Sequence, residues 1–139
     1  MSGKGSFILD AEFNSPAVSA AGEWLLAYDR SGKALFVTNT SGKNTSGDGF
    51  GENLSAHINK NGYVSVFSEA EGYKCALSVY DNGLKLLYRW KTTEYYGIAS
   101  AVSNDGKTCA AAVVKPENGA LACKIIILDL SKEGVKAEA

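Results

Sequence analysis

A pattern of about 40 residues occurs three times in this chain of 139 residues and limits its possible folds more than any other feature. The clearest copy, Ile98 to Gly134, contains two short apolar stretches around a tight Asn-Asp-Gly turn, then a glycine-containing loop and a third apolar stretch. Gly22, Gly62 and Gly106 occupy the same place in the three copies, at spacings of 40 and 44 residues. Repeats of this length with about four strands each are typical of β-propeller blades.

Apolar and polar residues alternate within the copies, and turn residues interrupt the alternation, which predicts short β-strands. Ala110, Ala111 and Ala112 have high helix propensity. Their position between an Asp-Gly turn and two valines favours a strand instead. With the short apolar piece 17–20, the expected strands are 23–29, 33–38, 54–59, 63–68, 75–80, 84–90, 98–103, 108–114 and 124–130.

The connecting segments carry further predictions. Phe7 to Phe13 has the length of a spare outer strand, and Val135 to Ala139 predicts the start of another. Asn39 to Asn53 is almost entirely Gly, Ser, Thr, Asn and Asp, and is interpreted as a mobile loop. Asn82-Gly83 predicts a type I′ hairpin turn, because this dipeptide tolerates the positive φ values that the turn requires. A second hairpin is expected to be centred near Asn118.

These elements predict an all-β fold with about three four-stranded blades, a partial β-propeller. Residues 1–6 are interpreted as a leader or cut point, and residues 7–139 as one domain with repeats at 17–53, 54–97 and 98–139. The alternative is a β-trefoil, because three repeats of about 40 residues also fit that fold. The strand order and the Asp-Gly turn of the third copy favour a blade, and the chain has no Q-x-W motif.

Three blades do not close a ring, because propellers have about four to eight. An open arc leaves two blade faces uncovered, with a risk of association. We therefore expect either a fragment of a longer propeller or a homodimer in which two copies complete a ring.

The third copy resembles the repeats of WD-like and periplasmic-type propellers. In those repeats a Ser-x-Asp-Gly-Lys turn precedes a strand of small residues, and an aspartate ends the third strand. Asn104 replaces the proline that is usual in this turn. The matching residues are Ser103, Asp105, Gly106, Lys107 and Asp129.

From Ala17 to Gly134 the chain resembles a family of uncharacterised bacterial proteins, in which a membrane-anchoring helix precedes an extracytoplasmic propeller-like domain. The resemblance implies a propeller-like fold and an extracytoplasmic location, with the parent protein anchored to the membrane. That family has no established activity, so the resemblance implies no catalytic residue.

Composition excludes several classes of function. The chain has 14 basic and 15 acidic residues, and a net charge of −1 gives no reason to expect nucleic acid or an anionic membrane as partner. No apolar run is long enough to span a membrane. Cys75, Cys109 and Cys123 lack C-x-x-C spacing and are interpreted as free thiols without a metal or redox role. No cofactor is expected.

Two features superficially suggest chemistry. His57 is the single histidine, on a predicted innermost strand, and is interpreted as a polar side chain between blades rather than a ligand or base. Gly47 to Glu52 resembles a phosphate or calcium loop. It lacks the flanking strand and helix, the P-loop lysine and the alternating acidic residues of those sites, so a flexible linker is expected. No catalytic triad can be assembled.

The predicted binding surface is one end of the blades. In a propeller, the loops between second and third strands and the loops between blades emerge on the same face of the ring, here called the upper face. Tyrosine and tryptophan beside mixed charges suit a protein or glycan contact. Trp90 and Tyr95 have the alternative role of packing between blades. The candidate residues are Arg30, Glu69, Glu71, Tyr73, Trp90, Tyr95, Tyr96 and Lys115.

The sequence therefore predicts a non-catalytic binding or scaffold module, part of a bacterial cell-surface propeller protein. One alternative is a fragment of a propeller enzyme whose active site lies on other blades. The other is a carbohydrate-binding domain of the trefoil type.

Overall fold

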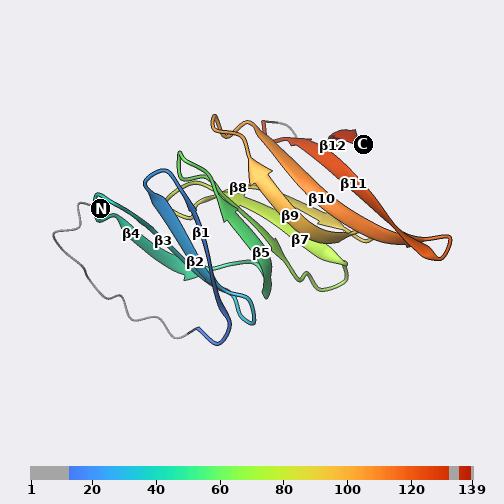
Figure 1. The fold of residues 1–139 in the computed structure, drawn as a ribbon, viewed down its shortest axis with the longest axis horizontal. Coiled ribbons are helices and arrows are strands. Elements are labelled where there is room, and N and C mark those ends of the chain that lie inside the picture. Colours follow the sequence, from blue (N-terminus) through green and yellow to red (C-terminus); the bar gives the residue numbers. More distant parts are fainter. Residues whose placement is uncertain (1–12, 132–134, 139) are drawn as a thin grey trace.

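The computed structural model describes residues 13–131 and 135–138, and every regular element in this part of the chain is a β-strand (Figure 1). Twelve strands form three antiparallel sheets of four strands each. In each sheet the strands lie side by side in their order along the chain, so every connection within a sheet is a hairpin. This confirms the predicted all-β, propeller-like fold with three four-stranded blades.

We call the three sheets blades 1, 2 and 3. Blade 1 comprises β1 (Pro16–Ala21), β2 (Trp24–Asp29), β3 (Ala34–Asn39) and β4 (Asn44–Asp48). Blade 2 comprises β5 (Asn53–Ile58), β6 (Val64–Ser68), β7 (Cys75–Tyr80) and β8 (Leu86–Thr92). Blade 3 comprises β9 (Tyr96–Val102), β10 (Thr108–Glu117), β11 (Ala120–Asp129) and β12 (Val135–Glu138).

The β-trefoil alternative is wrong, because each repeat closes into its own sheet of four consecutive strands. The three sheets succeed one another along the long axis of the molecule (Figure 1). The first strands of the blades lie innermost, since β5 contacts both β1 and β9. The alanine run at 110–112 lies within β10, so the predicted strand is confirmed over a helix.

The turn glycines behave as the repeat predicts. Gly22, Gly62 and Gly106 have φ values of 57°, 86° and 73°, each in the turn between the first and second strand of its blade. A positive φ strains any residue with a Cβ. The hairpin at Asn118 is also confirmed, with φ values of 51° and 80° at Asn118 and Gly119. The register of this hairpin places Val114, not Cys109, opposite Cys123. Cys109 lies five positions (114 − 109) from the place where it could form a disulfide with Cys123.

Two predictions about connecting segments were wrong, one for a loop and one for a turn. The segment from Asn39 to Asn53 is not a continuous loop, because it contains β4, which pairs with β3 along its whole length. An outer strand is held by backbone hydrogen bonds and needs no apolar side chains, so its polar sequence hid it. Gly83 is not the residue with positive φ in its turn, where Leu84 has φ 60°. The Asp81 carboxylate accepts hydrogen bonds from Gly83 N and Lys85 N, both 2.9 Å, and fixes this longer turn.

Some predictions concern segments outside the described residues. The leader at 1–6 and nearly all of the expected strand from Phe7 to Phe13 fall there, and Phe13 itself is not in a strand. Within the described part of the chain, no helix has the length and apolar character to cross a membrane.

Two apolar clusters hold the blades together. One lies between blades 1 and 2 and includes Leu26, Val37 and Ile58. The other lies between blades 2 and 3 and includes Phe67 and Ile126. Each blade is therefore stabilised mainly by its neighbour, as in other repeat architectures.

The same contact recurs at both blade interfaces. The Trp24 ring of blade 1 lies against Gly62 of blade 2, and the Tyr63 ring of blade 2 lies against Gly106 of blade 3. In both cases an aromatic side chain at the start of a second strand covers the turn glycine of the following blade. The two interfaces thus repeat in detail.

Candidate functional site

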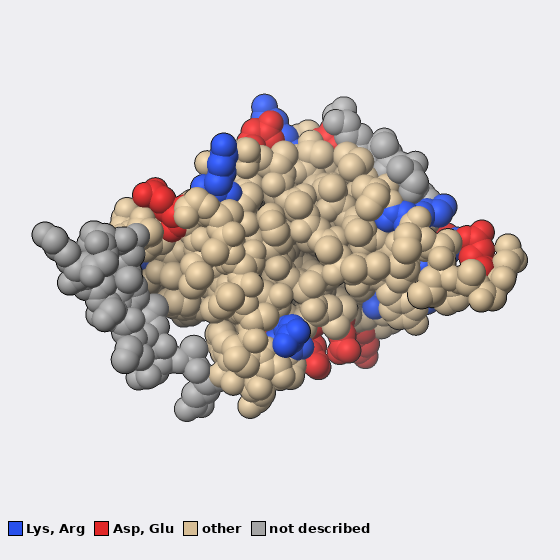
Figure 2. Space-filling view, in the orientation of Figure 1, with Lys and Arg blue, Asp and Glu red and all other residues tan. Residues whose placement is uncertain are grey.

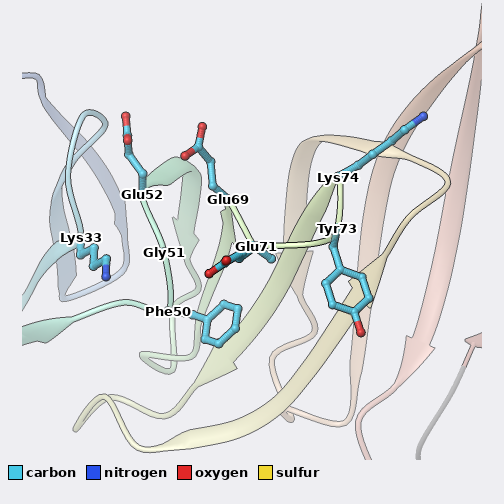
Figure 3. A pocket seen from close by; sticks show the side chains of 9 residues that line it. Lys33, Phe50, Gly51, Glu52, Glu69, Glu71, Tyr73 and Lys74 are labelled. Carbon is cyan, nitrogen blue, oxygen red and sulfur yellow. The ribbon is translucent and has the colours of Figure 1, made fainter.

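The upper face contains a groove of about 620 Å³ between the loops of blades 1 and 2 (Figure 3). Its residues come from the β2–β3 turn, the β4–β5 connection and the β6–β7 loop. Each of these segments lies 17 residues from the next along the chain (33 to 50 and 52 to 69), and they meet because the blades stack. The groove is lined by Lys33, Phe50, Gly51, Glu52, Glu69, Ala70, Glu71, Tyr73 and Lys74.

Backbone hydrogen bonds join the three segments. Gly49 N donates to Lys33 O at 2.7 Å, and Asn53 N donates to Gly32 O at 2.8 Å, so the β4–β5 connection is attached to blade 1. Glu69 N donates to Glu52 O at 3.0 Å, which attaches the β6–β7 loop to the same connection. The walls of the groove are therefore fixed relative to each other before any ligand binds, which lowers the entropic cost of binding.

Gly51 is required for this arrangement. A Cβ at this position would collide with the carbonyl oxygen of Glu69. The obstacle is backbone, so no side-chain rotation could relieve the collision. The close approach of the two segments therefore depends on the absence of a side chain at Gly51.

A buried polar network supports the groove from below. Asn53 is fully buried, and its Nδ2 donates to Asp29 O and Ala34 O, both at 3.1 Å. The Asp29 carboxylate accepts hydrogen bonds from Ser15 N, Ser31 N and Asn14 N. The hydrogen bond from Ser15 N, with those from Ser31 and Asn14, outweighs burial and lowers the pKa of Asp29. The β2–β3 turn is thereby held in place by an ionised carboxylate.

The groove combines charges of both signs with aromatic rings. Glu52 and Glu69 project in the same direction from adjacent loops, Phe50 and Glu71 lie near the centre, and Tyr73 lies at the other end (Figure 3). The lining residues include three glutamates and two lysines, so the lining is slightly acidic. On the face of the molecule shown in Figure 2, charged side chains lie mainly along the margins and form no broad patch of one sign.

Cations already contact the exposed rings around the groove. The Arg89 guanidinium lies 4.0 Å from the centre of the Phe50 ring, and Lys91 Nζ lies 4.9 Å from that of Tyr73. Lys74 Nζ lies 4.9 Å from the Tyr96 ring of blade 3. Cation–π contacts of this kind restrain the rings. The aromatic lining is therefore partly ordered in advance.

The structure brings together only some of the predicted binding residues. Glu69, Glu71 and Tyr73 line the groove. Tyr96 is 50% exposed, and its ring contacts Lys74, which lines the groove. Arg30 is exposed in the β2–β3 turn but does not line the groove.

The remaining candidates have structural surroundings. Tyr95 is only 4% exposed and belongs to the core between blades 2 and 3, so its prediction as a surface residue was wrong. Trp90 is half-buried and packs against the same core. Lys115 forms an ion pair with Glu94 at 2.9 Å, and that hydrogen bond raises the pKa of Lys115. Tyr95 and Trp90 therefore pack between blades, which is the alternative role predicted for them from the sequence.

Sequence reasoning missed Lys33, Phe50, Glu52 and Lys74. Phe50 and Glu52 lie in the stretch that was interpreted as a flexible linker. A signal was present, because Phe50 is an isolated aromatic residue in a polar segment that joins two blades, and blade-joining loops emerge on the upper face.

His57 lies outside the groove. It is on β5, five residues beyond Glu52, or roughly 17 Å along an extended strand. Its Nδ1 is buried and has no hydrogen-bond partner among the described residues, and burial lowers its pKa. Residues 13–131 and 135–138 contain no group of three or more His, Cys, Asp or Glu side chains that could hold a metal ion.

Comparison with protein families places the chain. The family DUF5711, described as a family of unknown function, matches residues 1–139. The chain belongs to DUF5711. The description of this family assigns no activity to the domain that forms the groove. A comparison with curated proteins found no match.

Solved structures support the fold. The DUF5711 domain is similar to hydrazine synthase from Kuenenia stuttgartiensis, a propeller-containing protein, with a TM-score of 0.56 and 13% sequence identity. The similarity covers 82% of this chain and 38% of that chain. The DUF5711 domain thus spans well under half of that protein. At this identity the similarity concerns the fold alone.

Proposed function

We propose that this DUF5711 domain is a non-catalytic binding module that holds a segment of a partner protein in its upper-face groove. The observation that carries the proposal is the groove itself, in which exposed aromatic rings and carboxylates from two loops lie together on a backbone that hydrogen bonds hold in place. Aromatic anchors surrounded by polar groups are typical of protein recognition sites.

The ring contacts favour a protein partner over a glycan. One face of Phe50 is occupied by Arg89, and Tyr73 is contacted by Lys91. A sugar ring needs an open aromatic face for stacking, whereas a protein segment can pack against ring edges and pair with carboxylates. A protein partner can therefore contact both the ring edges and the carboxylates of the groove.

We also propose a location on the bacterial cell surface, in a larger anchored protein. The resemblance of the repeats to extracytoplasmic, membrane-anchored propeller proteins supports this location. The proposed role needs no catalytic group in this domain.

The test screens the whole chain against a displayed library of random peptides and against an array of bacterial glycans. Selected peptides are expected to bind the wild type and to bind Phe50→Ala/Tyr73→Ala at least about tenfold more weakly, since aromatic anchors dominate such sites. Leu87→Ala, which removes a similarly exposed apolar side chain from β8, is the control and should bind normally. Binding of glycans but not peptides, or an equal loss in the control, would refute the proposal.

A further inference from the structure

Each blade has two faces, and we call the one directed toward the following blade its forward face and the opposite one its rear face. The forward faces of blades 1 and 2 are buried in the two core clusters. In blade 1 the forward face contains Leu26, Tyr28, Leu35 and Val37. In blade 2 it contains Phe67, Cys75, Leu77 and Val79.

The forward face of blade 3 has the same apolar character but is uncovered. Ala111, Val113 and Ile126 face blade 2, so the alternate residues of β10 and β11 point the other way. Ile125 on that face is 45% exposed, whereas the forward residues of blades 1 and 2 named above are buried. By register, the centre of this face consists of Ala99, Ala101, Ala110, Ala112, Val114, Cys123, Ile125 and Ile127. Thr108 and Asp129 lie at one end of it, and Pro116 and Leu121 at the other.

The rear face of blade 1 is the complementary surface. Ile58 and Val102 lie four residues before the turn glycines of blades 2 and 3, on rear faces, and are 0% and 5% exposed. Val18 has the same place before Gly22 in blade 1, yet it is 67% exposed. A preceding blade would bury Val18 as blades 1 and 2 bury Ile58 and Val102.

A polar contact between blades repeats in the same way. The residue three positions before each turn glycine is Ser19, Asn59 or Ser103. Ser19 Oγ accepts a hydrogen bond from Ile58 N at 3.1 Å, and Asn59 Nδ2 donates one to Val102 O at 3.1 Å. Both contacts join this position to the same place on the following blade. Ser103 is the equivalent residue of blade 3. On a following blade it would meet the residue equivalent to Ile58 and Val102, which in blade 1 is Val18.

We propose that a second copy of this chain covers both surfaces, with the forward face of blade 3 in each copy packed on the rear face of blade 1 in the other. One chain carries both halves of the contact, so a two-fold axis along the centre of the ring would form two identical interfaces and close it. The resulting six blades fall within the usual range of four to eight. The central residues of these two faces are uncharged, and by register the charged residues Asp129 and Asp48 lie at strand ends. Burial of the centre therefore has no charge-desolvation cost.

This dimer is independent of the groove proposed above, and its test measures mass rather than ligand binding. Light scattering over a range of concentrations should show the wild-type mass approaching twice that of one chain. Ile125→Lys and Val18→Lys should each remain monomers, because a lysine on either face would be buried in both interfaces. Leu87→Lys, at 43% exposure on the outer strand β8, is the matched control for Ile125 and should dimerise. A wild type that is monomeric at every concentration overturns the proposal and leaves the two faces for blades of another chain.

A cross-link distinguishes this geometry from other dimers. In a Cys123→Ser background, Ser103→Cys and Val18→Cys together should give a covalently linked dimer on mild oxidation, because the equivalent pairs lie in hydrogen-bond contact. Either cysteine substitution alone should give none. A dimer that forms without this cross-link, while circular dichroism shows the variant folded, would overturn the head-to-tail arrangement.

Discussion

The indole ring of Trp24 in blade 1 occupies the space that a side chain at Gly62 in blade 2 would need. A Cβ at Gly62 would come within 2.9 Å of indole Cε2 and 2.7 Å of Asn82 Cβ. Blade 2 can therefore approach blade 1 only with glycine at this turn.

Gly62→Ala should lower the free energy of unfolding by about 2–5 kcal/mol, the sum of left-handed backbone strain and overpacking. Gly42→Ala is the matched control, because Gly42 has φ 89° and no heavy atom within 4 Å of its Cβ position. It should cost only about 1–2 kcal/mol. Urea denaturation of both variants gives the comparison, and equal losses would mean that the interface contact adds nothing.

Asn59→Ala should weaken the contact between blades 2 and 3. Asn59 is buried, and its Nδ2 donates to Val102 O at 3.1 Å and Ser103 O at 2.8 Å. Removal of the carboxamide takes one donor from Val102 O and leaves Asn61 N and Tyr63 N without their acceptor, Asn59 Oδ1, for an expected loss of about 2–3 kcal/mol in stability to urea. Asn61→Ala removes one exposed hydrogen bond, to Asn104 O, and should cost under about 1 kcal/mol. A larger loss for Asn61→Ala would contradict this account.

The stability of the domain should depend on the ionisation of Asp29. Its pKa is lowered in the folded state, first by the hydrogen bond from Ser15 N. Its contribution is therefore present above the unfolded-state pKa and is lost as pH falls through the folded-state pKa. Asp29→Asn should be less stable than the wild type at neutral pH, and the difference should shrink in acid. Urea midpoints across the acidic range test this, and a difference that does not change with pH would refute it.

The three thiols should differ in reactivity. Cys75 and Cys109 are fully buried between blades 2 and 3, and burial raises the pKa of Cys75 and raises that of Cys109 to about 12. Cys123 is exposed. A disulfide reagent at neutral pH and low protein concentration should therefore modify one thiol in the folded domain and three in denaturant. Rapid modification of Cys109 in the folded state would show that the blade interface opens.

Local patterns predicted most of the blade architecture but little of the groove. The turns at Gly62 and Gly106 and the hairpin at Asn118 were predictable, because their backbone angles follow from neighbouring residues. Glu69, Glu71 and Tyr73 were predicted from the rule that certain propeller loops share a face. Phe50 was missed, because its proximity to Tyr73 depends on backbone contacts between blades rather than on any local pattern.

By itself the sequence determined the number of repeats, the strands with alternating apolar residues and the glycine turns, because each depends on residues close together in the chain. Only the tertiary structure decided that Asn44–Asp48 is a strand, since an outer strand is held by its partner's backbone. It also decided that Tyr95 is core, because the burial of an aromatic side chain depends on the blade that packs against it. The groove likewise exists only where stacked blades bring distant loops together.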